Sequence, residues 1–201
     1  MKLFKILKRA AGLYFRKPLV FYIALPNTQV PNLNVPKEIS FVSIDNINEY
    51  LKIIAKFKIP FSPFSEQRFE NGAIFSFLHN NNEYLVYGWA ISDCSAFTIG
   101  YTKTTLSIDE SSYILFDFYT NDNHRLKGYY NFILYKYRKL LRSNNILIYT
   151  APTNIGSHKG IIKSGFLAVG QYKKINMHKL LRLLKMKQVH ISKSHKKSLV
   201  M

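Results

Sequence analysis

The chain has 201 residues and a mass of 23.4 kDa, and 47% of its residues are hydrophobic. This composition supports one buried core of single-domain size and excludes disorder throughout. The net charge of +18 favours anionic partners, such as phosphorylated cofactors, sugar nucleotides, anionic lipid or nucleic acid, without choosing among them. The single cysteine, Cys94, excludes an internal disulfide and agrees with a reducing compartment.

The longest apolar run near the N-terminus, residues 19–25, is much shorter than the roughly 20 residues that a membrane-spanning helix needs. Before it, Lys2, Lys5 and Lys8 are interleaved with apolar residues, unlike the separate basic and apolar regions of a secretory signal. We therefore expect a cytoplasmic protein.

Charge is unevenly distributed along the chain. All eleven acidic residues lie within residues 38–122, together with five basic ones. Residues 1–37 carry seven Lys or Arg, and residues 123–201 carry seventeen. Two basic ends therefore flank a nearly balanced middle, an arrangement that would hold the protein near anionic surfaces or ligands.

Residues 1–17 have apolar residues at helical spacing and lysines mostly on the other side, which predicts a basic amphipathic helix. Such a helix can dock onto an anionic membrane face, at the inner side of the membrane for a cytoplasmic protein, or it can pack on its own domain. The Pro- and Asn-rich stretch 26–36 predicts an irregular connection. We thus expect an N-terminal extension and linker over residues 1–37, a domain over 38–175, and a basic tail over 176–201.

The first half of the domain predicts two helices, over residues 46–57 and 65–70, with Asp45 as the N-cap of the first. Apolar and β-branched patterns predict strands over residues 38–44, 73–79, 83–91, 95–101 and 112–120. The second half alternates, with helices over 128–142 and 156–164 and strands over 146–150 and 166–175. This order predicts an α/β (α+β) fold: a mixed, mainly antiparallel sheet with helices on its faces.

The loop after residue 120 has the character of an anion site. A helix that begins near Gly128 presents unsatisfied backbone N–H groups and the positive end of its dipole, and Arg125 and Lys127 add two positive charges. A side chain at Gly128 would keep an anion away from those N–H groups. A pyrophosphate suits such a site, although a solvated loop before an ordinary helix has the same residue types.

The wider segment resembles the acetyl-CoA-binding half of the GCN5-related N-acetyltransferases, the GNAT superfamily. Residues 125–130, Arg-Leu-Lys-Gly-Tyr-Tyr, resemble the loop Arg/Gln-x-x-Gly-x-Gly/Ala of that family. Asn154, Ser157 and the pair Gly165–Phe166 follow in the family's order and spacing. The resemblance is specific over residues 112–175 and extends only in outline to the rest of the domain.

The resemblance implies an acyl-CoA-dependent N-acyltransferase that uses acetyl-CoA or another acyl-CoA and no metal. The residues that it assigns to the cofactor are Arg125, Lys127 and Gly128 for the pyrophosphate and, for the pantetheine arm, the backbone of Tyr119 and Thr120 together with Asn154 and Ser157. An extended arm of this kind can bind between two diverging strands as an added strand. Helix capping accounts for Asn154 and Ser157 equally well, and both roles are compatible.

Two positions depart from the family pattern. Tyr130 stands where the family usually has Gly or Ala, which predicts a shifted helix start or a ring that lines the acceptor pocket. Ile161 stands where many members carry a tyrosine that protonates the leaving thiolate, so the usual general acid is missing.

The reaction also needs a group that accepts the proton of the attacking amine. Among the candidates we choose Asp117, because it lies on the strand that leads into the loop. Glu66, His79 and Glu83 are further candidates for the base, and His158 for a proton donor. Each of these side chains also fits a structural or solvated role.

The acceptor is expected to be a small molecule with a primary amine. The basic ends and the strand with Gly88 and Trp89 resemble bacterial acyltransferases that modify amino sugars for surface polysaccharides, which suggests a nucleotide-linked amino sugar. Anionic membrane lipid is then a peripheral partner. The alternative is a non-catalytic membrane- or nucleic-acid-binding protein on a GNAT-like fold, based on the run of Lys, Arg and Leu over residues 179–197.

Overall fold

The computed structural model describes residues 19–30, 33, 36–81, 83–92, 97–99, 104–106 and 112–172. All of them belong to one compact unit, Pro18–Tyr172. The predicted helix over residues 1–17, the basic tail over 176–201 and Cys94 lie outside the described residues.

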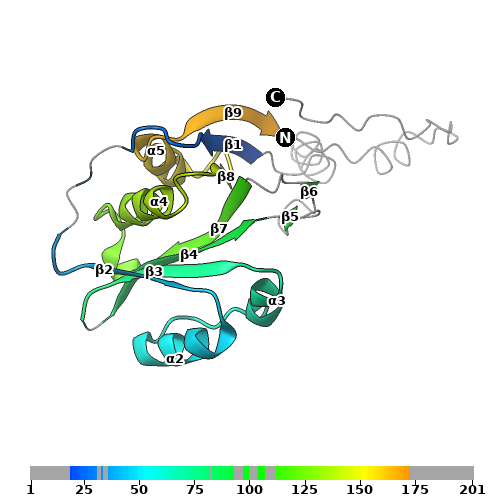
Figure 1. The fold of residues 1–201 in the computed structure, drawn as a ribbon. Helices are drawn as coiled ribbons and strands as arrows, with labels where there is room; N and C mark the ends of the chain where they lie inside the picture. Colours follow the sequence, from blue (N-terminus) through cyan, green and yellow to red (C-terminus); the bar gives the residue numbers. More distant parts are fainter. Residues whose placement is uncertain are drawn as a thin grey trace, which may run out of the picture. The chain divides into compact units, whose positions relative to one another are not determined.

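A seven-stranded sheet with the order β2-β3-β4-β7-β8-β1-β9 forms the centre of this unit (Figure 1). Its strands are β1 (Leu19–Ala24), β2 (Ser40–Ile44), β3 (Ile74–His79), β4 (Tyr84–Ser92), β7 (Ser112–Thr120), β8 (Asn145–Thr150) and β9 (Leu167–Tyr172). Neighbours are antiparallel except β7 and β8, which are parallel. Strands β5 (Phe97–Ile99) and β6 (Thr104–Leu106) form a separate antiparallel pair. The predicted mixed, mainly antiparallel sheet is confirmed.

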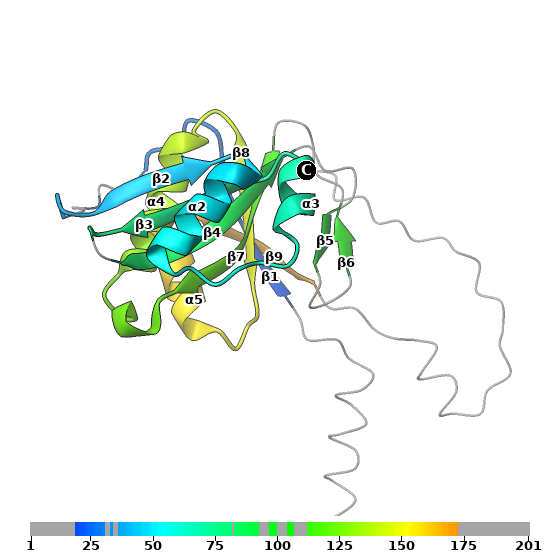
Figure 2. The ribbon, with the colours of Figure 1, turned by 90° about the horizontal axis from the view of Figure 1, so that it is seen from below.

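Two pairs of helices cover the two faces of the sheet. Helices α4 (Tyr129–Leu140) and α5 (Ile155–Lys163) lie on one face, and α2 (Ile47–Phe57) and α3 (Ser65–Glu70) lie on the other (Figures 1 and 2). Within the described part of the chain, every helix falls short of the length and apolar character that crossing a membrane requires.

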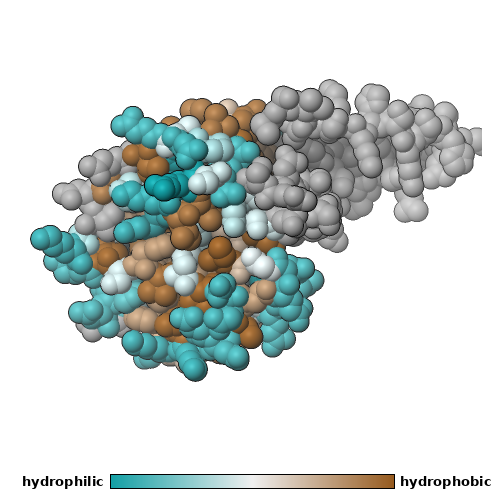
Figure 3. Space-filling view, in the orientation of Figure 1, coloured by the Kyte–Doolittle hydropathy of each residue, from teal (hydrophilic) through white to brown (hydrophobic). Residues whose placement is uncertain are grey.

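Each face of the sheet has its own core. The core under α4 and α5 is mainly aliphatic, with Leu115, Ile133 and Ile148 fully buried. The core under α2 and α3 is aromatic and includes Tyr50, Phe75, Phe77 and Trp89. Figure 3 shows apolar surface continuing between the two helical layers, with polar surface around it.

Strand β1 changes the predicted domain boundary. Residues 1–37 were expected to lie outside the domain, but Leu19–Ala24 pairs with β8 on one side and β9 on the other. Its six residues are all apolar or aromatic, as suits a strand covered on both faces, so they show no alternation. Their partners lie more than a hundred residues away in the sequence, where no local pattern reveals them. The seven-stranded sheet therefore includes residues 19–24, which were expected in the N-terminal extension.

Smaller differences concern where elements begin and end. Asn46, not Asp45, is the N-cap of α2, and its Oδ1 accepts a 2.9 Å hydrogen bond from the Glu49 N–H. Strand β6 and the short 3-10 helix η1 (Asp122–His124) were not predicted, because three-residue elements carry too little periodicity.

Candidate functional site

The parallel strands β7 and β8 pair along only part of their length. Their ladder begins at Ser112 and Asn145 and ends at Leu115 and Ile148. Strand β7 then continues to Thr120, five residues beyond its last pair with β8. The two strands thus leave an open end at which an extended ligand can add to the edge of β7.

A β-bulge shapes β7 at this open end. Tyr119 pairs with Tyr87 and Phe116 with Trp89, so Asp117 and Phe118 both lie opposite the single residue Gly88. Asp117 has a left-handed backbone with φ 50°. A side chain at Gly88 would lie 2.3 Å from the Phe118 ring, so the bulge needs glycine at that position.

The bulge brings two consecutive side chains to the α3 side of the sheet. In a regular strand Phe116 and Asp117 would point to opposite faces, yet Arg68 of α3 contacts both of them. The Arg68 guanidinium lies 4.8 Å from the centre of the Trp89 ring and donates a hydrogen bond to Asp117 Oδ2. The Asp117 side chain remains 54% exposed, so a ligand can still reach this carboxylate.

Two tyrosines from neighbouring strands interact electrostatically with Asp117. Tyr87 lies on β4, and burial, with the nearby acidic and phenolic groups, raises its pKa to about 12. Tyr149 lies on β8, just beyond the last pair with β7, and burial followed by the charge of Asp117 raises its pKa. Both phenols are therefore neutral around pH 7 and provide hydrogen-bonding groups near an exposed carboxylate.

On the other side of the open end, the loop after η1 leads directly into α4. Gly128 is the N-cap of α4 with φ 83°, and no side chain caps the helix. Space does not require glycine here, because an added Cβ would meet nothing within 4 Å, but the left-handed backbone does. Leu126 also has a positive φ, 64°, and is fully exposed. The uncapped N–H groups of α4 thus face an exposed loop, as an anion site requires.

The two cationic side chains of this loop have different surroundings. Lys127 is exposed. Arg125 is also exposed, but its guanidinium lies 2.7 Å from Asp122 Oδ1. The same oxygen accepts a 2.9 Å hydrogen bond from the Tyr119 hydroxyl, and Arg125 lies near the Tyr119 ring. Asp122 therefore holds Arg125 beside the end of β7, and this acidic partner was not predicted.

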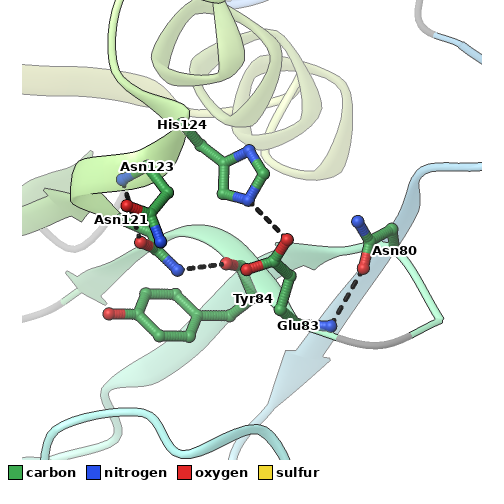
Figure 4. Close-up of polar contacts among 6 residues, drawn as sticks. All are labelled: Asn80, Glu83, Tyr84, Asn121, Asn123 and His124. Atoms are coloured by element: carbon green, nitrogen blue, oxygen red, sulfur yellow. Dashed lines mark hydrogen bonds and ion pairs between the residues drawn. The ribbon is translucent and has the colours of Figure 1, made fainter.

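Polar contacts hold the start of the loop against the β3–β4 turn (Figure 4). The Asn121 side chain donates to the Tyr84 carbonyl, and its backbone N–H donates to the Leu85 carbonyl at 2.9 Å. The buried His124 has its Nε2 2.7 Å from Glu83 Oε1, an ion-pair contact, although neither ring nitrogen makes a hydrogen bond of ordinary geometry. Glu83 itself is held by Asn80, whose Oδ1 accepts from its N–H. Glu83, a candidate base in the sequence, thus lies next to the loop that it supports.

Helix α5 begins at the same end of the sheet. Asn154 is its N-cap and accepts a 3.1 Å hydrogen bond from the Ser157 N–H, so the capping role predicted for Asn154 is confirmed. The Tyr130 ring packs between Phe118 and Gly160 on the α4 and α5 face, and its hydroxyl hydrogen-bonds to Ser157. Helix α4 starts where expected, and the Tyr130 ring lies on the face opposite Arg68 and Asp117.

The remaining candidates lie in different surroundings. His79 stacks near Phe57 and Phe77, and its Nδ1 lies 2.7 Å from the Asn80 carbonyl oxygen. Glu66 is exposed on α3. His158 is half-buried on α5 and hydrogen-bonds to the Tyr22 hydroxyl.

Sequence patterns did not reveal that Arg68, Tyr87 and Tyr149 interact with Asp117. Arg68 and Asp117 are 49 positions apart, and only the sheet and the bulge bring them together. Among the described residues, no group of three or more His, Cys, Asp or Glu side chains is placed to share a metal ion.

No protein-family model matches the sequence, and no curated protein matches it either. Solved structures do match the fold. A protein assigned to the GNAT acetyltransferases from Novosphingobium aromaticivorans matches 78% of the chain over 62% of its own length, with a TM-score of 0.53 and 12% identity. A GCN5-related N-acetyltransferase-like protein from Streptococcus suis matches 84% over 65%, with a TM-score of 0.51 and 13% identity.

A GNAT-family acetyltransferase from Colwellia psychrerythraea matches 85% of the chain over 61% of its own length, with a TM-score of 0.50 and 14% identity. The chain thus spans between 61% and 65% of the length of these three structures. At these identities the likeness concerns the fold alone. The chain has the fold of the GCN5-related acetyltransferases.

Proposed function

We propose that the protein is an acyl-CoA-dependent N-acyltransferase that transfers an acyl group, acetyl in the simplest case, to a primary amine. The observation that carries the proposal is the open end of β7 and β8 beside the uncapped start of α4. An extended arm with amide groups suits the end of β7 beyond its ladder with β8, and a diphosphate suits the N–H groups at Gly128. Acyl-CoA carries both features in one molecule.

In this proposal the chain binds the two ends of acyl-CoA differently. The helix start at Gly128, with Lys127 and Arg125, holds the pyrophosphate through backbone N–H groups and positive charge. The backbone of Tyr119 and Thr120 offers hydrogen-bonding groups to the pantetheine arm. Asn154 and Ser157 lie at the start of α5, the next helix at the same end of the sheet, and contact the arm from there.

Bound acyl-CoA supplies a thioester whose carbonyl carbon is open to attack by an amine. Backbone N–H groups at the bulge, near Tyr119, stabilise the oxyanion that develops on the thioester oxygen. Asp117 receives the amine: its exposed carboxylate accepts a hydrogen bond from the amine and a proton as the C–N bond forms. Arg68 fixes the direction of that carboxylate, with its guanidinium held over Trp89.

We further propose that the acceptor is an amino sugar, in nucleotide-linked form. Tyr87 and Tyr149 lie near the exposed Asp117 carboxylate, and the Tyr119 ring lies 5.8 Å from that of Tyr87; aromatic faces of this kind suit a sugar ring beside its amine. The net charge of +18 favours the phosphates of a sugar nucleotide. It also favours contact with anionic lipid at the inner face of the membrane.

A thermal shift assay with acetyl-CoA, a longer acyl-CoA and free CoA tests cofactor binding, because a ligand that binds only the folded state raises the melting temperature. Lys127→Glu places a negative charge next to the diphosphate, and we expect at least a tenfold loss of acetyl-CoA affinity with an unchanged melting temperature of the free protein. Lys52→Glu is the matched control, because Lys52 is equally exposed on α2, on the other face of the sheet.

Equal acetyl-CoA affinity of the two variants would mean that the pyrophosphate binds elsewhere. The acceptor class is tested separately, by transfer from acetyl-CoA to glucosamine, UDP-glucosamine and a peptide with a free N-terminus. Transfer to the peptide but to neither sugar would discard the amino-sugar proposal.

A further inference from the structure

Both basic ends of the chain are attached to the sheet at one point. In the register of β1 and β9, Leu19 is paired with Tyr172, so the first residue of β1 and the last residue of β9 lie about 5 Å apart. Residues 1–18 carry six Lys or Arg and residues 173–201 carry nine, and neither range has an acidic residue. Residues 19–172 carry fourteen basic and eleven acidic residues, a net charge of only +3. Most of the net charge of the protein is therefore attached at this point.

The point of attachment lies at the open end of β7 and β8. Strand β1 is antiparallel to β8, and Val20 is paired with Thr150, the last residue of β8. Leu19 therefore lies just beyond the end of β8, at the end of the sheet where the ladder between β7 and β8 has already stopped. Figure 2 shows β1, β8 and β9 side by side there. The basic residues nearest in the sequence to Leu19 and Tyr172 are Arg16, Lys17, Lys173 and Lys174.

Exposed apolar side chains lie at the same end of the sheet. Leu126, in the loop before α4, is fully exposed, and Ile155, the first residue of α5, is 64% exposed. Residues 123–172, which include α4, β8, α5 and β9, contain eight basic residues and no acidic one. The carboxylates of Asp117 and Asp122 at this end are paired with arginines. The open end therefore combines positive charge with apolar side chains that face solvent.

An anionic lipid membrane suits this combination better than a nucleic acid does. Anionic headgroups attract the basic residues, and apolar side chains among those residues can enter the boundary between headgroups and acyl chains. In the sequence, residues 1–17 interleave lysines with Leu, Ile and Phe, and residues 179–184 are Lys-Leu-Leu-Arg-Leu-Leu. A nucleic acid binds positive charge and stacks its bases on aromatic rings, but it offers aliphatic side chains little to enter.

We propose that the protein binds an anionic membrane through its two basic ends together, and that the open end of β7 and β8, with Leu126 and Ile155, faces the lipid. Because the two ends are attached to neighbouring strands, binding of one end keeps the other close to the membrane, so that both contribute to one affinity. The membrane contact does not depend on catalysis. That an acyltransferase site faces the lipid rests on the proposed function.

Sedimentation of the full chain with lipid vesicles, in the absence of acyl-CoA, tests the attachment. We expect binding to phosphatidylcholine vesicles that contain about one quarter phosphatidylglycerol, weaker binding as salt rises, and none to phosphatidylcholine alone. Each basic residue near an anionic surface contributes roughly fivefold to the affinity. The double change Lys5→Gln and Lys8→Gln at one end, or Lys185→Gln and Lys187→Gln at the other, should therefore lower the vesicle affinity at least tenfold.

The matched control is the double change Lys52→Gln and Lys56→Gln, because both lysines are exposed on α2, on the other face of the sheet. We expect it to change the vesicle affinity less than twofold. A control that loses as much as the end variants would show that the affinity follows net charge alone. A loss in the variant of one end only would show that this end binds by itself. Either result would overturn the two-part attachment.

Two isoleucines of α5 test the orientation. Ile155 is 64% exposed and Ile162 is 58% exposed, but Ile155 begins the helix at the open end and Ile162 lies in the last turn. They are about 10 Å apart along the helix axis. We expect Ile155→Gln to lower the vesicle affinity about fivefold, because an apolar side chain leaves the lipid boundary, and Ile162→Gln to stay within twofold of the wild type. Equal losses, or a larger loss for Ile162→Gln, would overturn the orientation.

The remaining outcomes separate this inference from the proposed function. A protein that binds an RNA or DNA oligonucleotide but no phosphatidylglycerol vesicles at the same salt would overturn the choice of a membrane as partner. Acetyl-CoA affinity is measured in parallel without vesicles. Vesicle binding without acetyl-CoA binding would overturn the proposed function and leave the membrane attachment intact. Acetyl-CoA binding without vesicle binding would overturn the attachment alone.

Discussion

The two faces of the sheet contribute to the candidate site in different ways. On the α4 and α5 side, the proposed anion site depends on backbone: the left-handed Gly128, the uncapped start of α4 and the end of β7 beyond its ladder with β8. On the α2 and α3 side, the exposed carboxylate of Asp117 depends on side chains, because Arg68 reaches it across an aromatic surface. A site made of backbone groups therefore follows from one chain segment, whereas a site made of side chains from several elements needs the whole fold.

The largest effect on stability is expected from removing the Trp89 ring, which belongs to the aromatic core on the α2 and α3 side. The Trp89 ring is buried and contacts the rings of Tyr50, Phe69 and Phe75 as well as Arg68. For Trp89→Ala we expect the free energy of unfolding to fall by about 3–5 kcal/mol, measured by urea denaturation, because a large cavity replaces the ring.

The same variant tests whether the faces act separately. At a temperature at which Trp89→Ala is still folded, we expect acyl transfer to fall much more than acetyl-CoA affinity. An equal loss of both would show that the aromatic core supports the α4 loop as well, and the division into two faces would no longer hold.

A second change disturbs the bulge, which both faces share. In Gly88→Ala the new Cβ would collide with the Phe118 ring, which is packed against Tyr130 and Tyr137. We expect a loss of about 1–3 kcal/mol in the free energy of unfolding, because the packed ring has to move. Urea denaturation measures it.

Gly170→Ala is the matched control for this substitution. It adds the same Cβ to another strand, where nothing lies within 4 Å, so stability should change by less than about 0.5 kcal/mol. Equal stability of the two variants would mean that the Phe118 ring moves aside freely and that Gly88 does not fix the bulge.

The smallest change in stability is expected when the ion pair between Arg68 and Asp117 is removed. For Asp117→Asn we expect the free energy of unfolding to change by less than about 1 kcal/mol, because the Asp117 side chain is largely in solvent. Activity should respond differently: steady-state kinetics should show transfer reduced at least tenfold, with KM for acetyl-CoA within twofold of the wild type.

Asp122→Asn tests the α4 side of the candidate site. It releases Arg125 from its carboxylate partner, so acetyl-CoA affinity should stay equal or rise while acceptor use stays constant. If Asp117→Asn instead lowers acetyl-CoA affinity and leaves transfer unchanged, Asp117 serves the cofactor and not the amine.

The sequence predicted the α4 side better than the other side, for a physical reason. The strand, loop, helix and strand from Ser112 to Thr150 follow one another in the chain, and periodicity and glycine position reveal them locally. Arg68, the partner of Asp117, is 49 positions away in the sequence. The contact between them depends on the bulge of β7, which no sequence pattern predicts. Strand β1 was missed for the same reason, since it pairs only with β8 and β9.

The position of β1 also has a consequence for biosynthesis. Leu19 leaves the ribosome about 125 residues before the partners of its strand, which begin at Asn145. At roughly 5–20 residues per second this interval lasts on the order of 6–25 s. During that time the nascent chain exposes an apolar strand without its partners, and we expect chaperones that bind apolar segments to protect it until β8 and β9 have been synthesised.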